Sequence, residues 1–553
     1  MKKFNNYMKI VFPIFILLLV FLQGKPVNAQ GFSQETQERL QQVLVNIQDN
    51  PTHSFVGGIS ASVKVDGLAS WQGATGFAAR NVDGQNNLLP GGQTFAPSTL
   101  SRTYSITKTL TAALVLELAK EGVLNLDQTI GSYLPLINAY NPRLNNSVTV
   151  RQLLNHRSGY SDWEEEFQLQ VAIAYDPTHV WTPYELMVFT RQLSTPGTLQ
   201  RYSHNNFVFL GAIIEAATGR PIQELFRERF IEPLGLTSMY LEGREPHGGR
   251  ALLASPHDNI SPFNPIFQFT GQPTFPNSYT NISRFPFTAI TSLGFTGGSI
   301  VANAADIADW SNALFGGRIT SPGVLDTLLQ SISPVPDPFG NLLGYGIKNT
   351  ANISGAYDFI GHNGSAPGYR SAMFYNAERK MTIVVLTNYA GANAYTISKK
   401  LFEALPDFVC GNDKNSKIIV CSNNNALCVA RPAAEVLIQK GAYLGACDAN
   451  RSNLSGLSEI GTRILPENYV KVSPNPAQSG ILRAAFRTSV PGKVSLTLFD
   501  MNGKVVSKVY NFEVAKSTEH KAHIETTGLA EGTYILVMKS STGMTKEKIV
   551  ISR

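Results

Sequence analysis

The sequence predicts a mixed α+β domain followed by a small all-β sandwich. In the first part of the chain, residues 58–67 (GISASVKVDG) alternate like a strand that ends in a turn, whereas residues 209–219 (FLGAIIEAATG) have helical spacing and a terminal glycine. After residues 473–476 (SPNP) the pattern changes to short alternating strands. The chain of 553 residues is 43% hydrophobic, so it can bury a large core and is expected to form more than one domain.

The first 29 residues predict a secretory signal peptide. Lys2, Lys3 and Lys9 precede an apolar run over residues 10–22, and the small residues of VNA at 27–29 suit cleavage before Gln30. The run is short for a membrane span, although a retained anchor is the alternative. No later stretch is long and apolar enough to cross a bilayer, so the mature chain is expected to have no transmembrane segment.

Charge argues against nucleic acid as a partner. Four of the 46 basic residues lie in the predicted signal peptide, which contains no acidic residue, so its removal lowers the net charge from +6 to +2. Nearly balanced charge gives no electrostatic footprint for a polyanion.

Residues 30–405 are predicted to form the first domain. The alternating strand at 58–67 and the helix at 209–219 belong to it, and the apolar run at 381–388 (MTIVVLTN) predicts a buried strand near its end.

Residues 406–465 are predicted to be a cysteine-containing linker or minor module. All four cysteines lie there: Cys410, Cys421, Cys428 and Cys447. In an exported protein two local disulfides are expected, and sequence alone leaves three pairings open. A zinc site with four thiolates is the alternative, but the segment contains no Cys-x-x-Cys pair.

Residues 466–553 are predicted to form the β-sandwich. Residues 494–506 (VSLTLFDMNGKVV) predict a hairpin with Asn502–Gly503 at the turn, and strands are expected at 532–540 and 548–553. About eighty residues suffice for such a domain.

Ser105 and Lys108 stand three residues apart where an apolar helix begins (SITKTLTAALVLELA). Residues i and i+3 share a helix face, so the amine can approach the hydroxyl. The first-turn amide of Ser105 is free to face a developing negative charge. The helix dipole and burial disfavour a proton on Lys108, so its neutral amine can act as a base. The alternative is a helix cap beside a solvated lysine.

Residues 32–405 resemble the serine β-lactamase and penicillin-binding superfamily, in particular its class C-like branch of esterases and D-amino-acid peptidases. The resemblance follows ordered motifs: YSITKT (104–109), LNLDQTIGSYLP (124–135), VTVRQLLNHRSGY (148–160), RYSHNNFVFLGAIIEAATG (201–219), FIEPLGLTSM (230–239), FTGGSIVANAADIADW (295–310) and IGHNGSAPGYRS (360–371). It implies an antiparallel sheet flanked by helices plus an all-helical subdomain.

The resemblance also implies catalytic roles. Ser105 would be the acylated nucleophile, Lys108 would help to remove its proton, and Tyr202 would move protons between nucleophile, leaving group and water. The backbone amides of Ser105 and Ser365 would form the oxyanion hole.

The resemblance implies a substrate-binding edge as well, with two departures from the commonest family pattern. His362 and Gly364 of HNG occupy a box that is Lys-Thr-Gly in many relatives and His-x-Gly in many esterase-like ones. His204 stands where the family's Tyr-x-Asn box has an asparagine that helps to hold Lys108 and the substrate amide. Imidazole is bulkier than an amide and can titrate. His362 and His204 together favour ester or D-amino-acid substrates over β-lactams.

From about residue 472 the chain resembles the C-terminal sorting domain of the type IX secretion pathway, through VSPNPAQSG, VSLTLFDMNGKVV and LAEGTYILVMKSSTGMTKEKIVISR. The resemblance implies an immunoglobulin-like sandwich that is read by outer-membrane secretion machinery. A carbohydrate-binding domain is the alternative, but Tyr534 is the only aromatic residue in its later strands. The cysteine stretch is similar to a short module of surface proteins, with no activity assigned.

Together these observations predict a serine hydrolase at the cell surface or outside the cell, acting on an ester or amide through a Ser105 acyl-enzyme with no cofactor and no metal. Three alternatives stay open: a surface recognition protein with little turnover, a true β-lactamase, and a protein that acylates without efficient deacylation.

Overall fold

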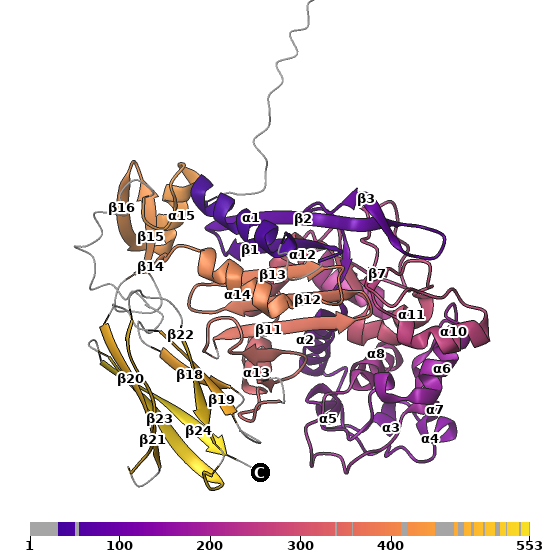
Figure 1. Ribbon diagram of the computed structural model, residues 1–553. Coiled ribbons are helices and arrows are strands. Elements are labelled where there is room, and N and C mark those ends of the chain that lie inside the picture. Colours follow the sequence, from indigo (N-terminus) through magenta and orange to yellow (C-terminus); the bar gives the residue numbers. More distant parts are fainter. Residues whose placement is uncertain are drawn as a thin grey trace, which may run out of the picture. The chain divides into compact units, whose positions relative to one another are not determined.

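A computed structural model gives the fold of the chain (Figure 1). It describes residues 31–49, 55–337, 340–356, 358–410 and 417–447, and, nearer the C-terminus, 469–473, 481–487, 492–500, 504–514, 520–526, 528–540 and 543–551. The predicted signal peptide, residues 1–29, lies outside the described residues. The chain divides into two compact units, residues 1–453 and 454–553.

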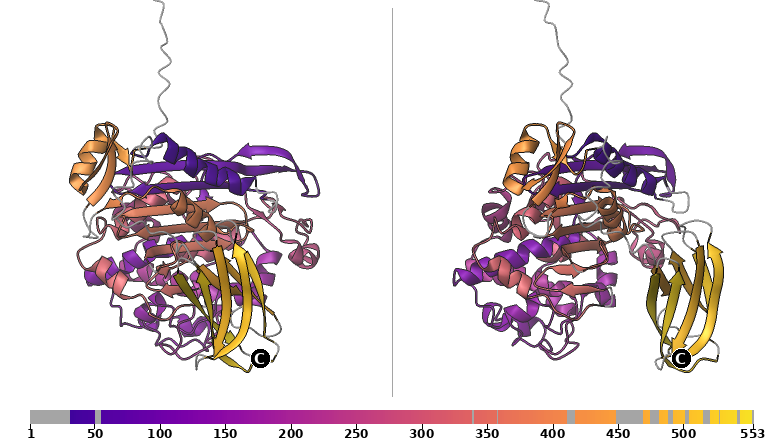
Figure 2. Two further views of the ribbon diagram at one scale, coloured as in Figure 1. Left: turned by 60° about the vertical axis from the view of Figure 1, so that its left-hand side comes forward. Right: turned by 90° about the vertical axis from the view of Figure 1, so that its left-hand side faces the viewer.

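An eight-stranded antiparallel sheet forms the centre of the first unit (Figures 1 and 2). In spatial order its strands are β3 (Leu88–Thr94), β2 (Ala69–Val82), β1 (Gly58–Val65), β13 (Met381–Thr387), β12 (Tyr369–Asn376), β11 (Phe359–Ala366), β10 (Lys348–Thr350) and β9 (Asn341–Leu343). The strands predicted at 58–67 and 381–388 are β1 and β13, which pair in the middle of the sheet. β13 is buried along its whole length, as its apolar run predicts.

Helices cover both faces of this sheet. Successive strand residues point to opposite faces, and accordingly Ile383 and Val385 belong to one apolar cluster whereas Val384 and Leu386 belong to another. Helices α1 (Gln34–Gln48) and α14 (Ala394–Ala404) pack on the first face. Helix α12 (Ala304–Phe315) packs on the second.

A helical region adjoins the second face and holds the largest apolar cluster (Figure 1). Its helices are α2 (Thr107–Lys120), α3 (Ile130–Tyr133), α4 (Ile137–Tyr140), α5 (Val150–Leu154), α6 (Phe167–Tyr175), α7 (Pro183–Phe189) and α8 (His204–Thr218), with α11 (Thr288–Gly298) against α2 and α8. α2 is buried at every residue from Thr107 to Leu118. α8 ends at Thr218, and Gly219 follows with a φ of 66°, the left-handed conformation that glycine adopts after a helix.

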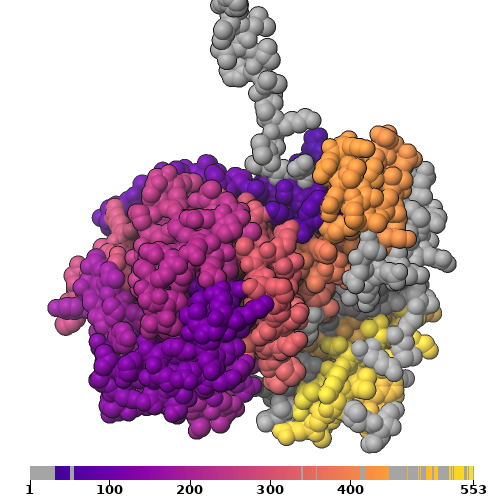
Figure 3. Space-filling model, turned by 180° about the vertical axis from the view of Figure 1, so that it is seen from behind, coloured from indigo at the N-terminus to yellow at the C-terminus, as the bar shows by residue number. Residues whose placement is uncertain are grey.

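The cysteine-containing segment is part of the first unit. It comprises β14 (Val409–Cys410), β15 (Lys417–Ser422), β16 (Asn425–Ala430), α15 (Arg431–Gln439) and β17 (Tyr443–Leu444). The cysteines form the disulfides Cys410–Cys428 and Cys421–Cys447, so the zinc alternative is excluded. Apolar side chains of β15 and α15 share a cluster with α1, and Figure 3 shows this segment in orange beside the indigo N-terminal residues.

The second unit is a sandwich of two antiparallel sheets. One contains β18 (Tyr469–Ser473), β19 (Ile481–Arg487) and β22 (His520–Glu525); the other has the order β21 (Val505–Val514), β20 (Gly492–Asp500), β23 (Gly532–Ser540) and β24 (Gly543–Ile551). Apolar side chains of both sheets form one core. β20 and β21 are the predicted hairpin strands, and the turn at Asn502–Gly503 lies outside the described residues.

Within the described part of the chain, no helix combines the length and apolar character that a bilayer span requires.

Candidate active site

Ser105 and Lys108 lie at the buried N-terminal end of α2. The α-helix begins at Thr107, and a 3₁₀ turn over Tyr104–Ile106 leads into it, so Ser105 sits in that turn rather than in the α-helix itself. Tyr104 has a φ of 47°, an unusual conformation for a residue with a side chain, and its ring packs edge-on against Tyr369. This sharp turn brings Ser105 Oγ within 3.1 Å of Lys108 Nζ.

Tyr202 completes a hydrogen-bonded trio from a distant part of the chain. It lies two residues before α8, and its hydroxyl donates to Ser105 Oγ at 2.8 Å. Its ring stacks on His156 with a centroid separation of 4.5 Å. His156 is itself buried and accepts the backbone N–H of Ser203. The structure therefore brings together three of the predicted site residues and fixes the phenol by a stacked ring.

Burial makes Lys108 a weak base that can be neutral. Its side chain is completely buried, and desolvation lowers its pKa to about 7, although the negative charges of Asp162 and Glu164 partly oppose the shift. A substantial fraction of the amine is therefore unprotonated at neutral pH. The pKa of Tyr202 is raised by burial, so the phenol keeps its proton in the resting site.

His204 lies against Lys108, with Nδ1 3.2 Å from Nζ. Its other ring nitrogen, Nε2, is 3.2 Å from the carbonyl oxygen of Gly294, which can only accept, so Nε2 carries the proton and Nδ1 is an acceptor. Burial lowers the pKa of His204 well below its usual value, in agreement with a neutral ring. Gly297 and Gly298 make room for the imidazole, since a Cβ at either position would lie within 3 Å of it.

These contacts determine where the lone pair of a neutral Lys108 points. A neutral amine has two hydrogens, and Lys108 Nζ has two acceptors that cannot donate in return: the Gly297 carbonyl oxygen at 2.7 Å and His204 Nδ1. When Lys108 is charged, its third hydrogen is donated to Ser105 Oγ; when it is neutral, the lone pair is left for the Ser105 hydroxyl. Ser105 can then donate to Lys108 while it accepts from Tyr202, which is the arrangement that a nucleophile and its base require.

Strand β11 passes beside the 3₁₀ turn that contains Ser105, and Gly364 makes the close approach possible. A Cβ on Gly364 would lie 2.2 Å from the carbonyl oxygen of Thr103. Pairing of β11 with β10 stops at Gly361, so the edge from His362 to Ala366 is not covered by β10. Ser365 is an exposed residue of this segment, opposite Arg370 in β12.

The two predicted substrate-binding histidines are both largely buried. His362 is 1% exposed, its Nδ1 lies 2.5 Å from the carbonyl oxygen of Asn363, and its ring lies 6.1 Å from that of Tyr202. His204 is 7% exposed and uses both ring nitrogens within the protein. Gly364 makes its close contact with Thr103. The structure thus places these three residues around the trio, in contact with protein groups.

Two residues near the trio were not predicted from the sequence as part of the site. Asp162 is buried and accepts the backbone N–H of His204 at 2.8 Å, which fixes the start of α8. Lys348, on β10, is also buried, and its Nζ lies 5.2 Å from the centroid of the Tyr202 ring.

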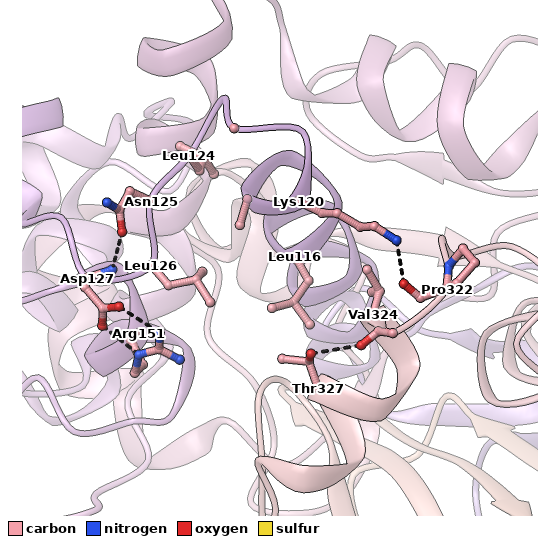
Figure 4. Close-up of a pocket in the computed structure, with 13 residues that line it drawn as sticks. Leu116, Lys120, Leu124, Asn125, Leu126, Asp127, Arg151, Pro322, Val324 and Thr327 are labelled. Carbon is pink, nitrogen blue, oxygen red and sulfur yellow. Dashed lines mark hydrogen bonds and ion pairs between the residues drawn. The ribbon is translucent and has the colours of Figure 1, made fainter.

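A cavity of about 640 Å³ lies at the other end of α2 (Figure 4). Its lining comprises Leu116, Ala119, Lys120, Gly122, Leu124, Asn125, Leu126, Asp127, Arg151, Pro322, Gly323, Val324 and Thr327. Arg151 pairs with Asp127 there, and Lys120 donates to the Pro322 carbonyl. It includes none of the predicted site residues.

Among the residues that the structure describes, no group of three or more His, Cys, Asp or Glu side chains is placed to hold a metal ion.

Comparison with known proteins identifies both units. The family described as Beta-lactamase matches residues 51–406, and the family described as Secretion system C-terminal sorting domain matches residues 471–552. A D-aminopeptidase of Brucella anthropi is 27% identical over 357 residues, which cover 63% of this chain and 59% of the relative. A second from the same species is 25% identical and covers 62% and 58%. The chain therefore spans less than two thirds of the length of these relatives.

Solved structures share the fold. A D-stereospecific amidohydrolase from Streptomyces sp. is 26% identical with a TM-score of 0.50, over 66% of this chain and 98% of that chain. The D-amino acid amidase from Ochrobactrum anthropi SV3 complexed with L-phenylalanine is 24% identical with a TM-score of 0.54, over 66% and 98%.

Proposed function

The chain belongs to the β-lactamase family of serine hydrolases, and on this basis we propose that it hydrolyses amides of D-amino acids and short peptides with a D-residue at the scissile bond. The observation that supports this most is the position of Ser105 Oγ, 3.1 Å from Lys108 Nζ and 2.8 Å from the Tyr202 oxygen. The choice of substrate rests on the relatives, which are named D-aminopeptidase and D-stereospecific amidohydrolase.

In the proposed first half-reaction, Ser105 Oγ attacks the carbonyl carbon and the neutral amine of Lys108 takes its proton. The Tyr202 hydroxyl gives its proton to the leaving nitrogen, so the C–N bond breaks and a phenolate forms. The amides of Ser105 and Ser365 are the proposed oxyanion donors. Loss of one such donor typically raises the barrier by about 3 kcal/mol.

In the proposed second half-reaction, the Tyr202 phenolate takes a proton from water, whose oxygen attacks the acyl carbon. The ester bond to Ser105 breaks, and the proton held by Lys108 returns to Ser105 Oγ. All three groups regain their starting protonation states, so no cofactor enters the balance.

The second unit indicates in which compartment the protein acts. Its match to the sorting domain shows that the protein is exported by the type IX pathway, to the cell surface or outside the cell. We infer that the secretion machinery is its partner and that the substrate is met outside the cell.

A substrate panel tests the proposal. Purified protein is supplied with D-phenylalanine amide, L-phenylalanine amide or nitrocefin. Released ammonia is measured for the two amides, and opening of the β-lactam ring is measured for nitrocefin. The proposal predicts that the D-amide is hydrolysed fastest and that Ser105→Ala abolishes this activity. Equal rates on both enantiomers, or fastest turnover of nitrocefin, would refute the substrate assignment.

A further inference from the structure

Lys348 is a buried cation that forms no ion pair with a described carboxylate, although the charge of Asp337 acts on it and raises its pKa against the effect of burial. Its side chain is 8% exposed, and its Nζ donates to Asn363 Oδ1 at 2.9 Å. Among the residues that the structure describes, no carboxylate forms an ion pair with it. A buried charge without a partner is costly, so a protein keeps one only where another contribution offsets the cost.

The amine of Lys348 faces the active-site phenol. Lys348 Nζ lies 5.2 Å from the centroid of the Tyr202 ring, and Lys108 Nζ lies 5.1 Å from the same centroid. One phenol therefore has two amines beside it, from α2 and from β10. An ammonium group near an aromatic ring is attracted to it, and its attraction to a phenolate is stronger because the charge is then full.

Asn363 holds Lys348 in this position. Its Oδ1 accepts from Lys348 Nζ and also from the Tyr395 hydroxyl, at 3.1 Å, which in turn lies 3.2 Å from Asn341 Oδ1. Residues from β9, β11 and α14 thus restrain a side chain that would otherwise have many rotamers. The orientation of Lys348 is built into the fold.

The other titratable groups that act on or contact Lys348 are Lys108, His156, His362, Tyr395 and Asp337. Asp337 carries a negative charge, which raises the pKa of Lys348 and favours its charged form. The two histidines are buried, and burial together with the neighbouring amines lowers the pKa of each well below its usual value. Desolvation lowers the pKa of Lys348 to about 8, so it is largely charged at neutral pH.

We propose that Lys348 is a positioning residue for Tyr202, whose ammonium group stabilises the phenolate that forms when Tyr202 gives its proton to the leaving nitrogen. This role rests on the proposed function. It explains why a buried cation that no described carboxylate contacts in an ion pair is kept next to the trio. It also predicts that Lys348 matters most for substrates whose leaving group needs a proton.

Paired substrates test this role. D-phenylalanine p-nitroanilide has a leaving nitrogen that must be protonated, whereas the p-nitrophenyl ester of D-phenylalanine releases a phenolate that leaves without a proton. Lys348→Met is expected to lower kcat/KM for the anilide by about tenfold or more, and for the ester by clearly less. Lys399→Met, a change of an exposed lysine on α14, is the matched control and is expected to leave both values unchanged.

The dependence of activity on pH is a second measurement, and it would not change if Lys348 only stabilised the fold. Variant and wild type are compared at each pH, so that ionisation of the substrate cancels. Wild-type activity on the anilide is expected to fall as Lys348 loses its proton near pH 8. Lys348→Arg keeps its charge and is expected to move this fall in activity to higher pH. This comparison tests the role of the charge even if Lys348→Met does not fold.

The outcomes separate this role from the proposed function. Equal losses on anilide and ester for Lys348→Met, or an unchanged pH profile for Lys348→Arg, would overturn the role of Lys348 while the hydrolase activity stands. Failure of the wild type to hydrolyse either compound would overturn the proposed function, and this role with it.

Discussion

His204 Nδ1 lies 3.2 Å from Lys108 Nζ, and the proton on His204 Nε2 faces the carbonyl oxygen of Gly294. The fixed tautomer makes the imidazole an acceptor toward the amine. A histidine at this position therefore does what the oxygen of an amide side chain can do, and directs the lone pair of Lys108 to Ser105.

Substitutions of His204 test this relationship. His204→Asn keeps an acceptor near Lys108 and is expected to retain most of the activity. His204→Leu removes the acceptor and is expected to lower kcat by about tenfold, since a hydrogen bond of about 1.4 kcal/mol corresponds to that factor. Steady-state hydrolysis of a D-amino acid amide measures kcat for both variants.

His179→Leu, at a half-exposed histidine paired with Glu185, is the control and should leave kcat unchanged. An equal loss of kcat in His204→Asn and His204→Leu would contradict the acceptor role.

The depressed pKa of Lys108 couples stability to pH. The folded protein holds this proton with a pKa of about 7, against 10.5 for an ordinary lysine, so between these values the unfolded state binds more protons. Stability from this group therefore rises as pH rises through that window, by about 1.4 kcal/mol per pH unit at most. The variant Lys108→Met has no amine at this position, so its stability lacks this rise with pH.

Thermal unfolding at a series of pH values measures the pH-dependent stability that Lys108 contributes. The difference in midpoint between wild type and Lys108→Met is expected to shift in favour of wild type as pH rises above 7. Parallel pH dependences of the two proteins would show that Lys108 is charged in the folded site and cannot be the base.

A substitution of Gly364 tests the close approach of β11 to the 3₁₀ turn that contains Ser105. In Gly364→Ala the new Cβ would lie 2.2 Å from the Thr103 carbonyl oxygen and 2.3 Å from Ser371 Oγ, so the strand or the turn must shift. We expect a loss of about 1–3 kcal/mol in stability together with a loss of activity. Gly84→Ala, with no atom within 4 Å of its Cβ, should change neither. Wild-type activity in Gly364→Ala would show that the approach is not needed.

The two disulfides are expected to differ in their effect on stability. Cys421 and Cys447 are buried, whereas Cys428 of the other pair is exposed. Replacing Cys421 and Cys447 together by alanine is expected to destabilise the first unit by about 2–4 kcal/mol, and more than the same change at Cys410 and Cys428. Denaturant unfolding of both double variants measures this, and a larger loss from the Cys410 and Cys428 pair would contradict the expectation.

The sequence predicted the elements whose signals are local. The alternation at 58–67 and the apolar run at 381–388 correspond to β1 and β13, because a strand with one or two buried faces carries its pattern in consecutive residues. The helix predicted at 209–219 starts five residues earlier, at His204, since its first turn is polar but buried. Helix boundaries of this kind depend on tertiary contacts.

Local signals could not reveal the surroundings of the trio. Ser105 and Tyr202 are 97 residues apart, and only the resemblance of ordered motifs linked them. Lys348 stands alone in a short strand, and its contact with Tyr202 arises from the pairing of β10 with β11. The disulfide pairing likewise depends on how β15 meets β16 and β17, which cysteine spacing does not determine.

Covalent labelling is the most direct test of the central claim that Ser105 is the nucleophile. Wild type and Ser105→Ala are treated with a fluorophosphonate probe, and the labelled peptide is located by mass spectrometry. If Ser105 is the nucleophile, the wild type carries one adduct, on Ser105, and Ser105→Ala carries none. An adduct on another residue, equal labelling of the two proteins, or no labelling of folded wild type would contradict it.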